Sequence, residues 1–169
     1  MGSSPGLPET EEPVYQLFDL YIGMTDRSNY PEHWVFMLAG QGSDRCTLYH
    51  MGGGFPPSSY FHSIETNKPL NHDKLVTREK ICSIPASRVP EFRDAVFAVP
   101  PHHCQRYVIA VVERLEDKGL VPKGTAARYV PRLQVDFFDG PVRKVSEEEY
   151  ADLVTQLGEE GARHELCFI

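Results

Sequence analysis

HWVFMLA, residues 33–39, is the most continuous apolar stretch of the chain, and GQGSD at residues 40–44 ends it. Strands that are buried on both faces have such runs, without the polar alternation of a half-exposed strand. The next stretch, CTLYHM at residues 46–51, predicts a second strand. Because a short turn rich in glycine and polar residues separates the two, we expect them to form a hairpin.

Further strands are predicted on both sides of this hairpin. Residues 14–22 (VYQLFDLYI) are rich in β-branched and aromatic side chains, as strands are. Weaker signals of the same kind occur later in the chain, at residues 60–65, 74–84 and 132–138.

Helical periodicity follows most of these strands. Residues 87–99 place apolar side chains at spacings of three and four, and residues 103–119 (HCQRYVIAVVERLEDKG) form the strongest predicted helix. Gly119 is its expected stop, and Ser146 with Glu149 forms the capping box of a final helix. Strands first and helices later is the order expected of an α+β domain.

Composition limits the classes of protein. The length of 169 residues fits one domain, and we expect a disordered tail at 1–12 and a single domain at 13–169. A net charge of −7 argues against a nucleic-acid partner, and 41% hydrophobic residues exclude wholesale disorder. No apolar run approaches the length of a transmembrane segment.

The cysteines indicate reduced thiols and no structural zinc. Cys46, Cys82, Cys104 and Cys167 are too few for a disulfide scaffold and include no CxxC pair. The N-terminus has no apolar signal region, so we expect a cytoplasmic protein. His102, His103 and Cys104 are adjacent at a helix start, where neighbouring side chains diverge, so we expect no metal site there. We also expect no cofactor, because nucleophilic catalysis by a thiol requires none.

Three residues could carry nucleophilic chemistry. Cys104 lies in the first turn of the strongest predicted helix, where unpaired backbone N–H groups and the helix dipole stabilise a thiolate. It shares a face with the apolar stripe and should point inward, as a buried core cysteine also would. His33 and His50 stand at the ends of the hairpin strands that would meet, and could act as base and orienting group. Each histidine could equally be a core or strand-edge residue.

The same residues resemble a known family. HWV at 33–35, LYH at 48–50 and HCQRYV at 103–108 are similar to the HWA-type strand, the V-I-H-type strand end and the N-C-E-H-F-V helix start of one group. That group is the lecithin:retinol acyltransferase and phospholipid acyltransferase group of the permuted papain-like (NlpC-like) superfamily. The resemblance covers roughly residues 14–121. It implies a permuted papain-like α+β fold in which an antiparallel sheet packs against helices. It also implies Cys104 as nucleophile, His33 as general base and His50 as the group that orients His33.

The expected function is cysteine-dependent acyl transfer or hydrolysis on a small-molecule ester, thioester or amide through an acyl-enzyme. Trp34, Tyr49 and Arg106 are the candidate substrate-binding residues. Trp34 could line an acyl pocket or belong to the core, and Arg106 could hold an anionic group or remain solvated. Two other classes stay open, namely a cyclase or isomerase that uses the same pocket and a non-catalytic binding module on the same scaffold.

Overall fold

The computed structural model describes residues 14–26, 32–53 and 60–134, and the single positions 2, 6, 152 and 155. In these ranges the fold is α+β: five strands form one antiparallel sheet, and the helices follow them in the chain. The strands are β1 (Leu17–Thr25), β2 (Trp34–Gly40), β3 (Arg45–Gly52), β4 (Phe61–Pro69) and β5 (Leu75–Pro85). The helices are α1 (Val89–Ala98), α2 (Cys104–Asp117) and α3 (Thr125–Tyr129).

The sheet has the order β4-β3-β2-β1-β5, with β2 at its centre. The predicted hairpin is confirmed as β2 and β3, in which Phe36 lies opposite Tyr49 and Met37 opposite Leu48. Two of the weaker strand signals, at residues 60–65 and 74–84, are also confirmed, as β4 and β5. Each of these two edge strands extends beyond the residues that the pattern marked.

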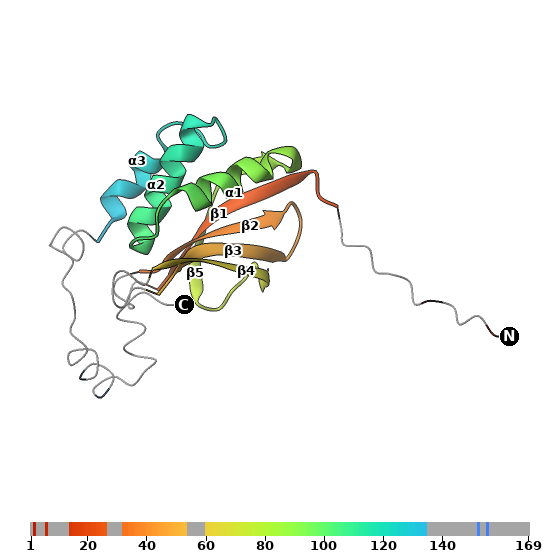
Figure 1. Cartoon of the computed structure of the whole chain (residues 1–169), viewed down its shortest axis with the longest axis horizontal. Helices are drawn as coiled ribbons and strands as arrows, with labels where there is room; N and C mark the ends of the chain where they lie inside the picture. The colour runs from red at the N-terminus through yellow and green to blue at the C-terminus, as the bar shows by residue number, and fades with distance from the viewer. Residues whose placement is uncertain are drawn as a thin grey trace.

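The helices cover one face of the sheet (Figure 1). Every residue of β2 is buried, as the continuous apolar run predicts. Its side chains alternate between two clusters: Trp34, Phe36 and Leu38 belong to the larger one, which includes residues of all three helices. Val35, Met37 and Ala39 belong to a smaller cluster with Leu48 and Leu75. Successive side chains of a strand point to opposite faces of the sheet, so β2 is fully buried because side chains cover the sheet on both faces at this strand.

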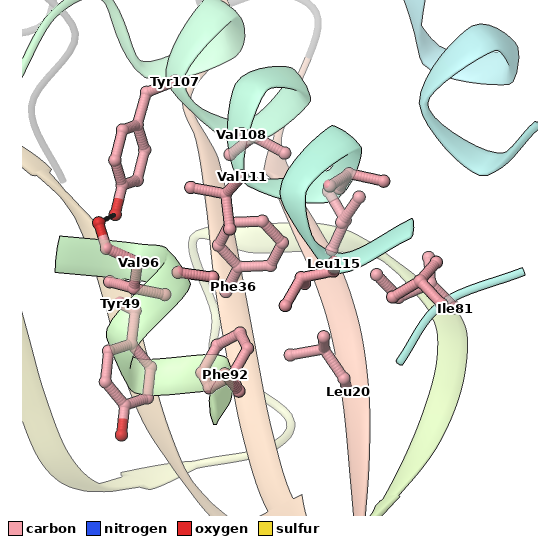
Figure 2. Packing of buried hydrophobic residues seen from close by; sticks show 14 of the residues in the cluster. Leu20, Phe36, Tyr49, Ile81, Phe92, Val96, Tyr107, Val108, Val111 and Leu115 are labelled. Carbon is pink, nitrogen blue, oxygen red and sulfur yellow. Dashed lines mark hydrogen bonds between the residues drawn. The ribbon is translucent and has the colours of Figure 1, made fainter. Parts of the chain in front are cut away.

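Helix α2 carries the predicted apolar stripe into the larger cluster, where Val108, Val111 and Leu115 face Phe36 of β2 (Figure 2). The Tyr107 hydroxyl donates a hydrogen bond to the Val96 carbonyl oxygen at 2.8 Å, which ties α2 to α1. The ring of Tyr107 is fully buried, so this bond satisfies the hydroxyl inside the core. The first residue of α2, Cys104, is thereby held at a fixed depth against the sheet.

The predicted strand at 132–138 is wrong where the structure describes it. Arg132 ends a 3₁₀ turn that starts at Val130, and residues 133 and 134 are not in a strand. Interactions of side chains, and not the backbone hydrogen bonds of a sheet, hold this segment. Arg132 pairs with Glu79 at 2.7 Å, and the Gln134 N–H donates to the side chain of Gln105. The short helix α3, just before it, had no predicted counterpart.

Several predictions concern residues outside the described part of the chain. These are the tail at residues 1–12 apart from 2 and 6, the residues from 135 to 138, the capping box at Ser146 and Glu149, and the thiol of Cys167. Within the described part, no helix is both long enough and apolar enough to cross a membrane.

Candidate active site

His33 directly precedes β2, and its backbone is held from both sides. Its N–H donates to Thr25 Oγ1 at 2.8 Å, and its carbonyl oxygen accepts from the Thr25 N–H at 3.1 Å. Only 2% of His33 is exposed. The strand pairing of β1 with β2 therefore fixes the position from which this imidazole projects.

The two predicted histidines are neighbours. Nε2 of His33 lies 3.3 Å from Nδ1 of His50, and the rings meet edge to face at a centroid distance of 5.3 Å. His50 lies near the end of β3, which runs antiparallel to β2, so the end of β3 lies beside the start of β2. The hairpin interpretation of the sequence thus predicted this pairing correctly.

Glu65 on β4 completes a chain of three side chains. Its Oε2 lies 2.8 Å from Nε2 of His50, and its Oε1 lies 3.1 Å from Nζ of Lys68. Burial by itself would raise the pKa of Glu65, but the hydrogen bonds from His50 and Lys68 outweigh it and lower that pKa. Burial, together with the neighbouring His33, lowers the pKa of His50.

No signal in the sequence marks Glu65 as a candidate site residue. A strand was predicted at its position, but nothing local to β4 indicates that its carboxylate faces a histidine of β3. The register supplies that information, because Leu48 lies opposite Glu65 and His50 is two residues further along the same side of β3.

The remaining nitrogen of His33 has no partner. Nδ1 is buried. Among the described residues, it is the one buried side-chain nitrogen or oxygen that has no hydrogen bond. Such groups are uncommon in folded proteins, because an unpaired buried polar atom costs free energy. Both nitrogens of His50, by contrast, have neighbours within hydrogen-bonding distance.

Cys104 is the first residue of α2, is 1% exposed and belongs to the helix-facing core, so its predicted inward orientation is confirmed. Its Sγ lies 3.9 Å from the carbonyl oxygen of Glu32, the residue before His33. The same Sγ is 3.9 Å from each ring nitrogen of His103. The thiol is thus directed at the main chain beside His33, while Nδ1 of His33 makes no hydrogen bond to it.

His103 caps the helix that carries the thiol. The Gln105 N–H donates to Nδ1 of His103 at 3.2 Å, so one of the first N–H groups of α2 is satisfied by a side chain. An imidazole nitrogen that accepts a hydrogen bond carries no proton, which assigns the proton of a neutral His103 to Nε2. A histidine cap is outside the usual set of capping residues, which explains why the sequence pattern did not predict it.

A network of side-chain amides holds the backbone of Glu32, whose carbonyl oxygen the thiol contacts. Gln105, which is fully buried, donates through Nε2 to the Glu32 carbonyl oxygen at 2.8 Å and to Oε1 of Gln134 at 2.7 Å. The Glu32 N–H donates to the same Oε1 at 2.7 Å. The backbone N–H and C=O of Glu32 are therefore both held, by side chains from α2 and from the segment after α3.

The three candidate substrate-binding residues lie in different surroundings. Trp34 and Tyr49 are core residues, at 0% and 2% exposure, and pack edge to face on Tyr129 and Phe92. Arg106 is partly buried on α2. A role of these residues in binding substrate stays a prediction.

His62 lies on β4, outside the pair formed by His33 and His50. It is partly buried and its Nε2 lies 2.9 Å from the Val99 carbonyl oxygen, in the connection between α1 and α2. Its ring also packs against Phe97 and Tyr107. Within the described ranges, no group of three or more His, Cys, Asp or Glu side chains is arranged to hold a metal ion.

Comparisons of this chain with protein-family models, with curated proteins and with solved structures gave no match. What the fold and the site define by themselves is an α+β protein in which a buried thiol at a helix start contacts the carbonyl oxygen of Glu32. The next residue, His33, pairs with a second histidine that has a carboxylate partner.

Proposed function

We propose that this protein is a permuted papain-like enzyme that transfers acyl groups through Cys104. The element order supports the fold assignment, because the two histidine-bearing strands precede the cysteine-bearing helix in the chain. The observation that carries the chemical proposal is Nδ1 of His33, a buried basic atom without a partner next to the peptide that the thiol contacts. A nucleophilic thiol needs such a base, and the base needs a third group that orients it.

The first half of the reaction forms an acyl-enzyme. The thiol of Cys104 turns away from the Glu32 carbonyl oxygen and its proton moves from sulfur to Nδ1 of His33, which leaves a thiolate and an imidazolium. The thiolate sulfur attacks the carbonyl carbon of an ester, thioester or amide, and the carbonyl π pair becomes an oxyanion. When the tetrahedral intermediate collapses, the bond to the leaving group breaks, and the imidazolium returns its proton to that group.

The start of α2 stabilises the two anions of this reaction, which are the Cys104 thiolate and the oxyanion of the tetrahedral intermediate. The N–H of Cys104 belongs to the first turn of α2, where backbone N–H groups lack intrahelical acceptors and the helix dipole is positive. Donors of this kind stabilise a thiolate, and they stabilise an oxyanion that forms beside it.

The second half of the reaction releases the acyl group. His33 takes a proton from water or from an alcohol, thiol or amine acceptor, whose oxygen, sulfur or nitrogen then attacks the thioester carbonyl. The Cys104 thiolate leaves and recovers the proton from His33. The reaction is a hydrolysis with water and an acyl transfer with any other acceptor, and it needs no cofactor.

The test is intact-mass measurement after incubation with a panel of acyl thioesters and esters. We expect the natural chain and Cys82→Ala, a matched cysteine control, to gain the acyl mass, and Cys104→Ala to gain none. His33→Ala should gain it more slowly, by on the order of 10²–10⁴, the usual effect of losing a general base. An adduct on another cysteine but not on Cys104 would refute the proposal.

The same experiment separates the two other classes. A cyclase or isomerase would convert its substrate without an adduct and would tolerate Cys104→Ala. A binding module would show neither an adduct nor turnover, while a ligand from the panel would raise the melting temperature.

A further inference from the structure

The contact between Glu65 and Nε2 of His50 bears on which nitrogen of His50 carries a proton. An ionised carboxylate only accepts hydrogen bonds, so the 2.8 Å contact between Oε2 of Glu65 and Nε2 of His50 requires a proton on that nitrogen. The second carboxylate oxygen is held by Lys68 at 3.1 Å, which favours the ionised form.

The proton on Nε2 of His50 also determines which nitrogen of His33 carries a proton. Neutral His50 then has a lone pair at Nδ1, and the atom 3.3 Å away, Nε2 of His33, must donate to it. His33 is left with its lone pair at Nδ1, the buried nitrogen that has no partner.

The opposite pair of tautomers has one favourable contact and one unfavourable contact. With the proton on Nδ1, His50 could donate to the Met51 carbonyl oxygen at 3.3 Å. Its Nε2 lone pair would then face the carboxylate of Glu65 at 2.8 Å, and the two would repel each other. The carboxylate therefore selects between the two tautomers.

We propose that Glu65 is a positioning residue that holds the protons of both histidines on Nε2 and so keeps Nδ1 of His33 available as a base. This inference rests on the function proposed above, because it explains how the base of that reaction is kept in its reactive tautomer. It assigns to β4 a part of the site that neither the sequence motifs nor the Cys104–His33–His50 set contains. Glu65 acts only through His50.

Nitrogen-15 NMR of histidine-labelled protein measures the tautomers directly. In the natural chain we expect His33 and His50 to be neutral with the proton on Nε2. In Glu65→Lys the ammonium group donates to Nε2 of His50, so the protons of both rings should move to Nδ1. Glu65→Gln, whose amide can accept or donate, should give a mixture, and Glu65→Asp should preserve the natural tautomers.

The reactivity of Cys104 provides the second readout. With a proton on Nδ1, His33 cannot accept one from the thiol, so Glu65→Lys should slow iodoacetamide labelling of Cys104 near neutral pH by on the order of 10²-fold. Lys68→Gln is the matched control on the same strand, since it removes the other partner of Glu65 and leaves the His50 contact. We expect it to keep the tautomers and most of the labelling rate.

The results can distinguish the two proposals. Unchanged Nε2 protonation in both Glu65→Lys and Glu65→Gln would overturn the role of Glu65, even if the natural chain forms an acyl adduct. A tautomer change in these variants, without any acyl adduct on the natural chain, would retain the positioning role and refute the acyl-transfer function. If Glu65→Lys does not fold, the tautomer mixture expected of Glu65→Gln decides alone.

Discussion

Gln105 and Gln134 hold each other through two hydrogen bonds, although 29 residues separate them. The side-chain amide of Gln105 donates to Oε1 of Gln134 at 2.7 Å, and the backbone N–H of Gln134 donates to Oε1 of Gln105 at 3.1 Å. Both residues also bond to the backbone of Glu32, whose carbonyl oxygen faces the Cys104 thiol. Gln105, the residue after Cys104, thus ties the start of β2 to the segment that follows α3.

Replacing Gln105 tests the value of this network. Gln105→Ala removes the bonds to the Glu32 carbonyl and to Gln134 inside a fully buried site. Because buried groups that lose partners keep their desolvation cost, we expect the free energy of unfolding to fall by about 1–3 kcal/mol. Urea denaturation measures it, with Glu113→Ala on the exposed face of the same helix as control. Equal losses in the two variants would contradict a structural role for the network.

The contact between Tyr107 and Val96 predicts two distinct losses of stability. Tyr107→Phe keeps the buried ring and removes the 2.8 Å hydrogen bond to the Val96 carbonyl, so we expect a loss of about 1 kcal/mol. Tyr107→Ala also removes the ring and should cost about 3–5 kcal/mol. Thermal and urea unfolding of the pair separate the two contributions. A Phe variant as unstable as the Ala variant would show that the hydroxyl matters more than the packing.

The cysteines should differ in reactivity with iodoacetamide. Burial raises the pKa of the Cys46 and Cys82 thiols to about 11, so both should label slowly until the solution is strongly alkaline. Cys104 lies at a helix start and should label fastest near neutral pH, because the helix start stabilises its thiolate. Site-resolved mass spectrometry of the labelled protein checks the order. Labelling of Cys104 no faster than that of Cys46 would contradict its assignment as nucleophile.

Stability should fall as the solution is acidified below the ordinary pKa of histidine. Burial and the neighbouring His33 lower the pKa of His50 below 6.5, so the unfolded chain binds its proton first as pH falls. Because the unfolded state then carries more protons than the folded state, the free energy of unfolding decreases with decreasing pH. One such group contributes at most about 1.4 kcal/mol per pH unit.

The measurement is urea unfolding at several pH values between about 7.5 and 5.5, the range that spans the ordinary histidine pKa. His50→Gln should show a weaker dependence on pH than the natural chain. His72→Gln, in the connection between β4 and β5, should keep the natural dependence. The same slope in all three proteins would show that His50 is not the group responsible.

Most of the local structure could be predicted from the sequence. The continuous apolar run predicted the doubly buried β2, and the apolar stripe predicted α2, because both signals lie within one element. The strand prediction at 132–138 failed at its described start, because Arg132 is held in a 3₁₀ turn by its side-chain pairing with Glu79, an interaction that no local pattern indicates. Helix α3 is only one turn long and too short for a periodic signal.

The sequence by itself determined that His33 and His50 stand at meeting ends of a hairpin and that Cys104 opens a helix with its side chain toward the core. These statements depend on spacing within single elements and across one short turn. The tertiary structure alone decided that Glu65 reaches His50, that Gln134 reaches Gln105, and that the thiol contacts the peptide before His33. Those contacts depend on the β3–β4 register and on how α2 packs on the sheet. Packing and strand pairing between distant segments set these relations, and no local pattern of residues encodes them.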